Sequence, residues 1–178
     1  YTLCTIQASQ SCVSYFVPTL IDNNSSSLSF QNRQMPLPSD EPRIAPKLVR
    51  AVEGNTYLTE MFLQNTNLQS QEAEVLAGSL KKNQTLREVN LELNNIDVNA
   101  CTLLAESLLE NKALEVFRIG GCQKEGGLGQ RFEEALGQSI MKNNTILKLG
   151  VDIFNPTWRN VVDRKLIQNN DRRREKRK

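Results

Sequence analysis

The sequence predicts an α/β fold in which short strands and helices alternate along the chain and stack as a solenoid. Two observations predict it. Within residues 83–110 the spacing of apolar residues changes from two, which is typical of a strand, to three and four, which is typical of a helix. This unit recurs at Asn55, Asn83, Asn111 and Asn143, in steps of 28, 28 and 32 residues. Because a strand and a helix with one apolar face each can bury it only against neighbours, the units must stack.

The strand of each unit carries the pattern of a leucine-rich repeat. Residues 86–96, LREVNLELNNI, match the pattern L-x-x-L-x-L-x-x-N-x-L. The apolar positions of the pattern are filled by Leu86, Val89, Leu91 and Ile96. A step near 28 residues with a full helix indicates the ribonuclease-inhibitor-like form of the repeat. We therefore predict a solenoid of about four strand–helix repeats.

The asparagine of this pattern, Asn94, has a predicted structural role. At the turn that leaves the strand, its side-chain amide can bond backbone groups that no neighbouring strand reaches, so that stacked repeats build a ladder. Cys122 occupies the equivalent position of the next repeat, where the pattern allows Asn or Cys, whereas Thr66 departs from the pattern in the first repeat. We expect Cys122 to be a ladder residue rather than a reactive thiol, and Cys101 to lie in the core.

The helices follow the strands with apolar stripes at three- and four-residue spacing. The stripes consist of Ala73, Leu76, Ala77 and Leu80; Ala100, Leu103, Leu104 and Leu108; and Phe132, Ala135, Leu136 and Ile140. Upstream, Pro46 at a helix start and Gly54 as a stop predict one more helix, which belongs to a repeat whose strand is missing.

The last predicted element is a helix that closes the open end of the solenoid. Asn155 is suited to cap this helix and Pro156 to occupy its first position. Its apolar stripe consists of Trp158, Val162 and Leu166. Its other face carries Arg159, Arg164 and Lys165. The helix is therefore predicted to be apolar on one side and basic on the other, and a basic tail follows it.

The chain divides into two parts. Residues 1–43 contain a serine run and several prolines, a composition that suits a linker or a disordered segment. Residues 44–178 are predicted to form a single leucine-rich-repeat domain with a C-terminal basic helix and tail. No stretch approaches the roughly 18 to 20 apolar residues that cross a bilayer, so we expect no membrane span.

The net charge of +2 is distributed unevenly. From Arg159 onward there are nine Lys/Arg and three Asp/Glu, a balance of +6, which leaves −4 for the rest of the chain. Basic runs of this kind bind acidic proteins, nucleic acid or acidic lipid. The tail has no interleaved aromatic residues for base stacking and the rest of the chain is acidic, which argues against nucleic acid.

Nothing in the sequence indicates catalysis. The chain has no histidine, the commonest general base, and the glycines at 120–129 lack the spacing of a phosphate-binding loop. Glu133 and Glu134 are adjacent on an amphipathic helix, and we interpret them as part of a solvated face. The four cysteines fit neither a zinc pair nor a dense disulfide framework, which favours reduced thiols. We predict no enzyme activity, no cofactor and no metal.

The last third of the chain carries a specific series of motifs. Residues 126–153 read GGLGQRFEEALGQSIMKNNTILKLGVDI, and residues 155–178 read NPTWRNVVDRKLIQNNDRRREKRK. This series resembles the end of the tropomodulin and leiomodin family, in which a Leu-Gly loop, a helix with an early Glu, an N-x-T-L-L-K-x-G strand and a final basic helix with NN-D-x-x-R follow in this order. The matching residues are Leu128, Gly129, Glu133, Asn143, Thr145, Leu147, Lys148, Gly150, Arg159, Asn169, Asn170 and Asp171.

The resemblance implies a function for the chain. It implies the family's C-terminal domain, which binds actin at the pointed, slow-growing end of the filament, in the cytoplasm and on the cytoskeleton. In the family, tropomyosin binds through upstream regions that this sequence does not contain. The chain ends without the actin-binding extension of leiomodins, which favours capping over nucleation. The alternative function is a generic leucine-rich-repeat interaction module, for example one that binds a small GTPase.

The candidate actin contacts come from two kinds of place. Strand-to-helix loops vary in solenoids without disturbing the core, and the final helix carries the basic charge. The candidate residues are Asn95, Asp97, Gln123, Lys124, Glu125, Arg159, Lys165, Arg172 and Arg173.

Overall fold

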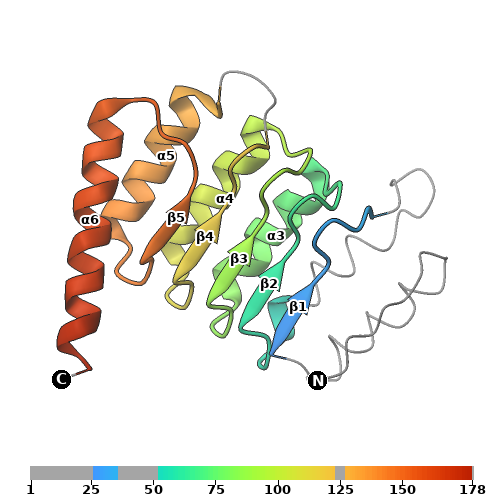
Figure 1. The fold of residues 1–178 in the computed structure, drawn as a ribbon, viewed down its shortest axis with the longest axis horizontal. Helices are drawn as coiled ribbons and strands as arrows, with labels where there is room; N and C mark the ends of the chain where they lie inside the picture. Colours follow the sequence, from blue (N-terminus) through green and yellow to red (C-terminus); the bar gives the residue numbers. More distant parts are fainter. Residues whose placement is uncertain (1–25, 36–51, 123–126, 178) are drawn as a thin grey trace.

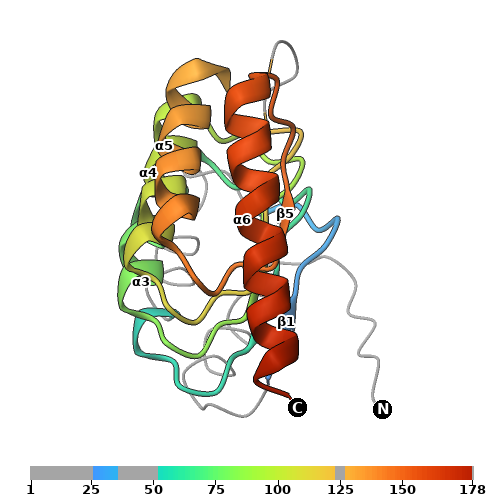
Figure 2. The same cartoon turned by 90° about the vertical axis from the view of Figure 1, so that its left-hand side faces the viewer.

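The computed structural model describes residues 26–35, 52–122 and 127–177, which form a curved array of alternating strands and helices (Figure 1). The elements are β1 (Ser27–Ser29), β2 (Glu60–Phe62), α3 (Ser70–Lys82), β3 (Glu88–Asn90), α4 (Val98–Glu110), β4 (Val116–Arg118), α5 (Gly129–Lys142), β5 (Lys148–Gly150) and α6 (Pro156–Glu175). The strands form one parallel sheet in the order β1-β2-β3-β4-β5, and α3, α4 and α5 cover one of its faces (Figures 1 and 2). The predicted α/β class is confirmed.

The strands align one repeat against the next. The middle residues of the five strands pair in the row Leu28, Met61, Val89, Phe117 and Leu149. The first four are buried and Leu149 packs against the same core. Because alternate residues of a strand lie on the same face of a sheet, the residues two positions on continue the buried surface. These are Leu63, Leu91 and Ile119, each 0% exposed.

Within the described part of the chain the sheet has five strands, where the sequence predicted four. The additional strand β1 lies within residues 1–43, the predicted linker, and its Leu28 is buried against Met61 of β2. Pairing with β2 satisfies backbone groups that an edge strand leaves unpaired. Residues 1–25 and 36–43 lie outside the described residues, so the domain boundary at residue 44 stays a prediction. Of the helix predicted to end at Gly54, residues 52–54 are helical and the earlier part lies outside the described residues.

The predicted ladder at the ends of the strands is confirmed. Asn94 Oδ1 accepts hydrogen bonds from the backbone N–H groups of Thr66 and Leu68, both at 3.0 Å. Asn94 Nδ2 donates to the carbonyl oxygens of Leu63 (2.6 Å) and Leu91 (2.9 Å). Thr66, which departs from the pattern, still contributes, because its hydroxyl lies 3.1 Å from Asn94 Oδ1. The side chain of one repeat thus joins two repeats.

The two described cysteines are buried and free, as predicted. Cys122 Sγ lies 3.5 Å from the carbonyl oxygen of Leu91 and takes the ladder position, and Cys101 belongs to the hydrophobic core. The neighbouring Cys122 thiol and burial both raise the pKa of Cys101. Because the thiolate is the nucleophilic form, Cys101 is a structural thiol and not a reactive one.

A second ladder of asparagines joins the other ends of the helices. Asn83, Asn111 and Asn143 directly follow α3, α4 and α5, and all three are buried. In each, Nδ2 donates to two carbonyl oxygens of the preceding repeat, and Oδ1 accepts from backbone N–H groups two and three residues later. These asparagines are the residues at which the sequence repeats begin. Each repeat therefore extends from one asparagine of this ladder to the next.

The predicted helix stripes are largely correct. Leu103 is the error: it was assigned to the core, but it is 41% exposed because it lies beside the stripe of α4 that faces the sheet. Ala135 is half-buried at the margin of the corresponding stripe of α5. The buried face of α4 instead includes Cys101, Thr102 and Ala105, so it is displaced from the stripe that apolar spacing alone predicts.

Candidate functional site

The final helix α6 packs beside α5 and β5 at the C-terminal end of the solenoid (Figure 2). Asn155 Oδ1 accepts hydrogen bonds from the N–H groups of Thr157 (2.9 Å) and Trp158 (3.4 Å), and Pro156 occupies the first turn. Val162 is buried, and Trp158 and Leu166 pack against the core. The prediction of a helix that caps the solenoid is confirmed.

A buried carboxylate holds the turn that leads into this helix. Glu133 of α5 is 4% exposed, and its two oxygens accept hydrogen bonds from the N–H groups of Phe154 (2.6 Å) and Asn155 (3.0 Å). The interpretation of Glu133 as part of a solvated face is wrong, because the turn brings two unpaired donors to its side chain. Glu134 does lie on the exposed face.

The second half of α6 is attached to the last repeat by two side-chain amides. Asn169 Nδ2 donates to the carbonyl oxygens of Asn143 (3.2 Å) and Ile146 (2.8 Å), and Asn170 Nδ2 donates to that of Leu147 (3.0 Å). Asn169 thus makes the donor half of the second ladder. Asn169 Oδ1 has no hydrogen-bond partner among the described residues. The other asparagines of this ladder are followed by a turn that supplies N–H groups, whereas Asn169 lies within a helix and no such turn follows it. These side-chain amide hydrogen bonds hold the C-terminal half of α6, and the hydrogen bonds of Glu133 hold the turn before its N-terminal end.

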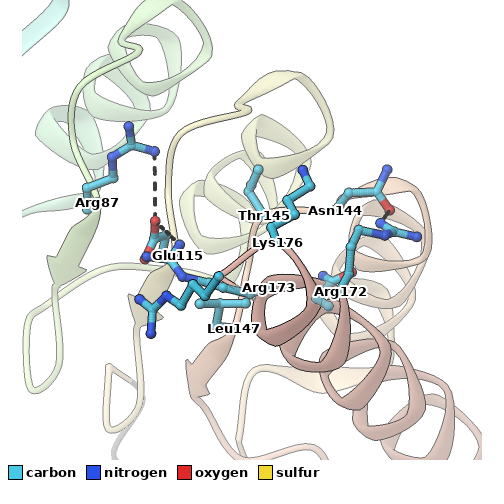
Figure 3. Close-up of a pocket in the computed structure, with 10 residues that line it drawn as sticks. Arg87, Glu115, Asn144, Thr145, Leu147, Arg172, Arg173 and Lys176 are labelled. Atoms are coloured by element: carbon cyan, nitrogen blue, oxygen red, sulfur yellow. Dashed lines mark hydrogen bonds and ion pairs between the residues drawn. The ribbon is translucent and has the colours of Figure 1, made fainter.

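The C-terminal turns of α6 and the residues before the strands enclose a hollow of about 310 Å³, which we call the basic hollow (Figure 3). It is lined by Arg87, Glu115, Asn144, Thr145, Leu147, Asn169, Arg172, Arg173, Lys176 and Arg177. Its single carboxylate, Glu115, is paired with Arg173 and lies 3.8 Å from Arg87 Nη1. Five cationic side chains against one paired carboxylate leave the hollow strongly positive.

Cationic side chains also lie close together beside the basic hollow. Asn144 Oδ1 accepts hydrogen bonds from both Lys165 Nζ (2.8 Å) and Arg172 Nη1 (2.6 Å). Burial, and then the charge of Arg172, lower the pKa of Lys165. Positive groups held this close disfavour one another's charge, and an anionic group placed among them would relieve the repulsion. The arrangement therefore favours an acidic partner.

The structure separates the candidate contacts into two groups. Asn95, Asp97 and Arg159 are exposed at the edge where the strands end, and Arg172 and Arg173 lie at the edge where the strands begin. Arg173 lies 14 positions after Arg159 on α6, which corresponds to about 21 Å along the helix axis. Lys165 lies between them and belongs with the second group through Asn144.

Several candidates also hold the fold together. Asp97 caps α4, because its Oδ1 accepts from the N–H of Ala100 at 2.8 Å, and Asn95 Nδ2 donates to Gln69 Oε1 at 3.0 Å. Arg173 joins α6 to the start of β4 through Glu115. The loop candidates Gln123, Lys124 and Glu125 lie outside the described residues.

Sequence reasoning missed two residues of the basic hollow, Arg87 and Glu115. Both directly precede a strand, and they are 28 residues apart, so aligning the repeats would have placed them side by side. The apolar periodicity that defines the repeats carries no information about these charged positions. Asn144, which binds two cations of α6, belongs to the motif of the last repeat but not to the predicted contacts.

Two absences concern the described residues alone. No helix among them has the length and apolar character needed to cross a membrane. Within the same ranges, no group of three or more His, Cys, Asp or Glu side chains is arranged to hold a metal ion.

Comparison with known proteins identifies the family. Residues 37–172 match the model of the TMOD/LMOD leucine-rich domain. Among solved structures, the chain is similar to one described as Leiomodin-1 Actin-Binding Site 2, with 25% identity, a TM-score of 0.84 and 95% of each chain covered. It is also similar to the tropomodulin C-terminal domain of Caenorhabditis elegans, with 20% identity, a TM-score of 0.80, and 94% of this chain and 98% of that chain covered. No curated protein matches the sequence. The chain belongs to the TMOD/LMOD leucine-rich domain family, that of the tropomodulins and leiomodins.

Proposed function

We propose that this chain binds actin at the pointed end of the filament and regulates subunit exchange there. The observation that carries the proposal is the match to the actin-binding site 2 of leiomodin-1, which extends over 95% of both chains at a TM-score of 0.84. The sequence motifs of the last repeat and of α6 point to the same family. The proposed role is one of binding, and it places the chain on the cytoskeleton in the cytoplasm.

The charge distribution supports an acidic protein partner. The surface of actin is acidic, and the end of α6 with the basic hollow is the cationic part of an otherwise acidic chain. Complementary charge steers encounter and fixes orientation more than it adds affinity. We infer that the basic hollow receives an acidic segment of a terminal actin subunit.

The separation of the two groups of contacts also supports a large partner. A ligand that touches both Arg159 and Arg173 must span about 21 Å along α6. A small molecule would fill the hollow and leave the other edge free, whereas a protein surface can cover both. A protein that lies across this end of the filament sterically excludes the next actin monomer. Binding would in this way regulate subunit exchange. Tropomyosin binding is expected through family regions beyond this chain.

The proposal is tested by elongation from filaments whose fast-growing ends are blocked. Micromolar wild-type chain is expected to slow the addition of actin monomers at the free pointed ends, measured by the fluorescence of labelled actin. An increase in the number of growing filaments would instead indicate nucleation. No effect on either rate would contradict the proposal, and tight salt-sensitive binding to RNA or to a small GTPase would then favour the alternatives.

The basic hollow is tested by charge reversal. We expect Arg172→Glu with Arg173→Glu to raise the half-inhibitory concentration by about tenfold, because exposed ion pairs contribute up to about 1 kcal/mol each and 1.4 kcal/mol corresponds to tenfold. The effect should shrink as salt rises. The matched control is Lys81→Glu with Lys82→Glu, which makes the same charge change on α3, at the other end of the solenoid, where both lysines also pair with carboxylates. Equal losses in the two variants would show that only net charge matters.

A further inference from the structure

The turn that follows each of the first four strands has a residue with left-handed backbone geometry. Three positions beyond the strand, φ is +58° at Asn32, +51° at Asn65, +59° at Leu93 and +70° at Gly121. The backbone N–H groups of the first three bond to the next repeat, with Leu93 N donating to the carbonyl oxygen of Gly120 at 3.0 Å. The geometry is therefore a requirement of the repeat and recurs whatever the residue.

Leu93 does not suit this position. Asparagine and glycine adopt positive φ readily, whereas a leucine there is strained. Burial would compensate for the strain, but the side chain of Leu93 is 62% exposed. Asparagine would also extend an existing row, because Asn65 Nδ2 donates to Asn32 Oδ1 at 2.9 Å. Folding alone thus favours another residue at position 93, and backbone strain that folding does not need is characteristic of functional sites.

A second apolar side chain lies at the same edge of the sheet. Phe154, between β5 and α6, is 67% exposed, and its N–H is held by buried Glu133. Both exposed side chains rest on glycine backbone: a Cβ on Gly121 would lie 2.7 Å from Leu93 Cδ2, and one on Gly127 would lie 2.6 Å from Phe154 Cε2. Leu93 and Phe154 are therefore exposed and yet packed against glycine backbone, a contact that restricts their rotamers and so lowers the entropy lost when they bind.

The surroundings of this pair are polar. Asn95 and Asp97 follow Leu93 closely in the chain, and Arg159 follows Phe154 on the first turns of α6; all three are exposed. Apolar anchors within a polar rim are the pattern of residues that carry most of the energy of a protein interface. This edge is distinct from the basic hollow, which lies where the strands begin.

We propose that Leu93 and Phe154 are the apolar anchors of the actin interface and insert into an apolar depression on a terminal actin subunit. This inference rests on the proposed function and names the residues that give it affinity, whereas the basic hollow gives it orientation. Contact at both edges also explains why α6 is held at both of its ends: the distance between the anchors and the hollow must stay constant for one partner to meet both.

The test uses Leu93→Asn, for which folding and binding are expected to change in opposite directions. The thermal unfolding midpoint should stay equal or rise, because the turn loses its strain, while the half-inhibitory concentration at pointed ends should rise about tenfold or more, as for a central interface residue. Phe154→Gln should weaken inhibition similarly and leave the helical circular dichroism unchanged. Met141→Gln is the matched control, since Met141 is 53% exposed on α5, and it should inhibit like the wild type.

The outcomes are separable. Wild-type inhibition with unchanged inhibition by Leu93→Asn and Phe154→Gln would overturn the anchors and leave the proposed function standing. No inhibition by the wild type would overturn both. A clearly lower unfolding midpoint for Leu93→Asn would overturn the assignment of Leu93, because it would show that the leucine serves the fold. An equal loss in Met141→Gln would show that general surface hydrophobicity, and not this edge, binds actin.

Discussion

Replacing Asn111 with alanine is expected to destabilise the solenoid by about 3 to 6 kcal/mol, because a buried backbone group left without its partner costs about 1 to 3 kcal/mol. Asn111 is 0% exposed. Its Nδ2 donates to the carbonyl oxygens of Leu80 (2.6 Å) and Asn83 (3.1 Å), and its Oδ1 accepts from the N–H groups of Ala113 (2.9 Å) and Leu114 (2.7 Å). The substitution orphans four groups, and partial entry of water keeps the total below their sum.

Denaturant unfolding followed by circular dichroism measures this effect. A loss of this size is a large part of the roughly 5 to 15 kcal/mol that stabilises a domain, so the variant should unfold at far lower denaturant. The control is Asn169→Ala, which removes only the two donor bonds of the same ladder and a carbonyl oxygen that already lacks a partner. We expect it to cost clearly less. A loss under about 1 kcal/mol for Asn111→Ala would mean that the ladder does not hold the repeats together.

Replacing Gly137 with alanine is expected to displace the final helix. A Cβ at this buried position of α5 would lie 2.1 Å from Cε3 of Trp158, which packs directly on the glycine. The ring must move, and a forced fit of this kind costs typically about 1 to 3 kcal/mol. Because Trp158 is the single tryptophan of the chain, its fluorescence emission reports the displacement as a shift to longer wavelength. Pointed-end inhibition should fall in parallel, since α6 joins the two groups of contacts.

Replacement of Gly78 with alanine should have the opposite effect on stability. Gly78 lies at an exposed position of α3, and a Cβ there would meet nothing within 4 Å. Alanine is preferred over glycine in a helix by about 0.5 to 1 kcal/mol, so Gly78→Ala should stabilise the protein. Unchanged tryptophan emission and stability in Gly137→Ala would show that α6 does not depend on this contact. Destabilisation by Gly78→Ala would show instead that the helices of the solenoid do not tolerate alanine in general.

Repeating patterns made most of the fold predictable. Apolar positions such as Val89 and Leu91 recur because each repeat packs against similar neighbours on both sides. The same apolar pattern therefore appears several times in the chain. The cap of α6 could be predicted equally well, since Asn155 and Pro156 act on backbone groups two or three residues away. Features that depend on neighbours within one helical turn or one repeat can be read directly from local sequence.

The candidate site was predictable only in part. Arg172 and Arg173 were found because a basic run is visible in any sequence, but their partners Asn144 and Glu115 were not. Those partners lie 28 and 58 residues away along the chain. A contact between residues so distant depends on how the repeats stack and on where α6 docks. Leu93 is a further example, because a leucine within a leucine-rich repeat gives no sign that its backbone is left-handed and its side chain exposed.

The sequence alone therefore established the repeat, its register, the closing helix and the resemblance to the tropomodulins and leiomodins. Only the tertiary structure decided three other matters. A three-residue strand at Ser27–Ser29 has no pattern of its own and forms because β2 offers it an unpaired edge. Glu133 is buried rather than solvated because a turn 21 residues later presents two N–H groups to it. The basic residues form a hollow because α6 ends against the strands that begin at Glu88 and Val116. In each case the deciding partner is remote in sequence, and its position exists only once the chain has folded.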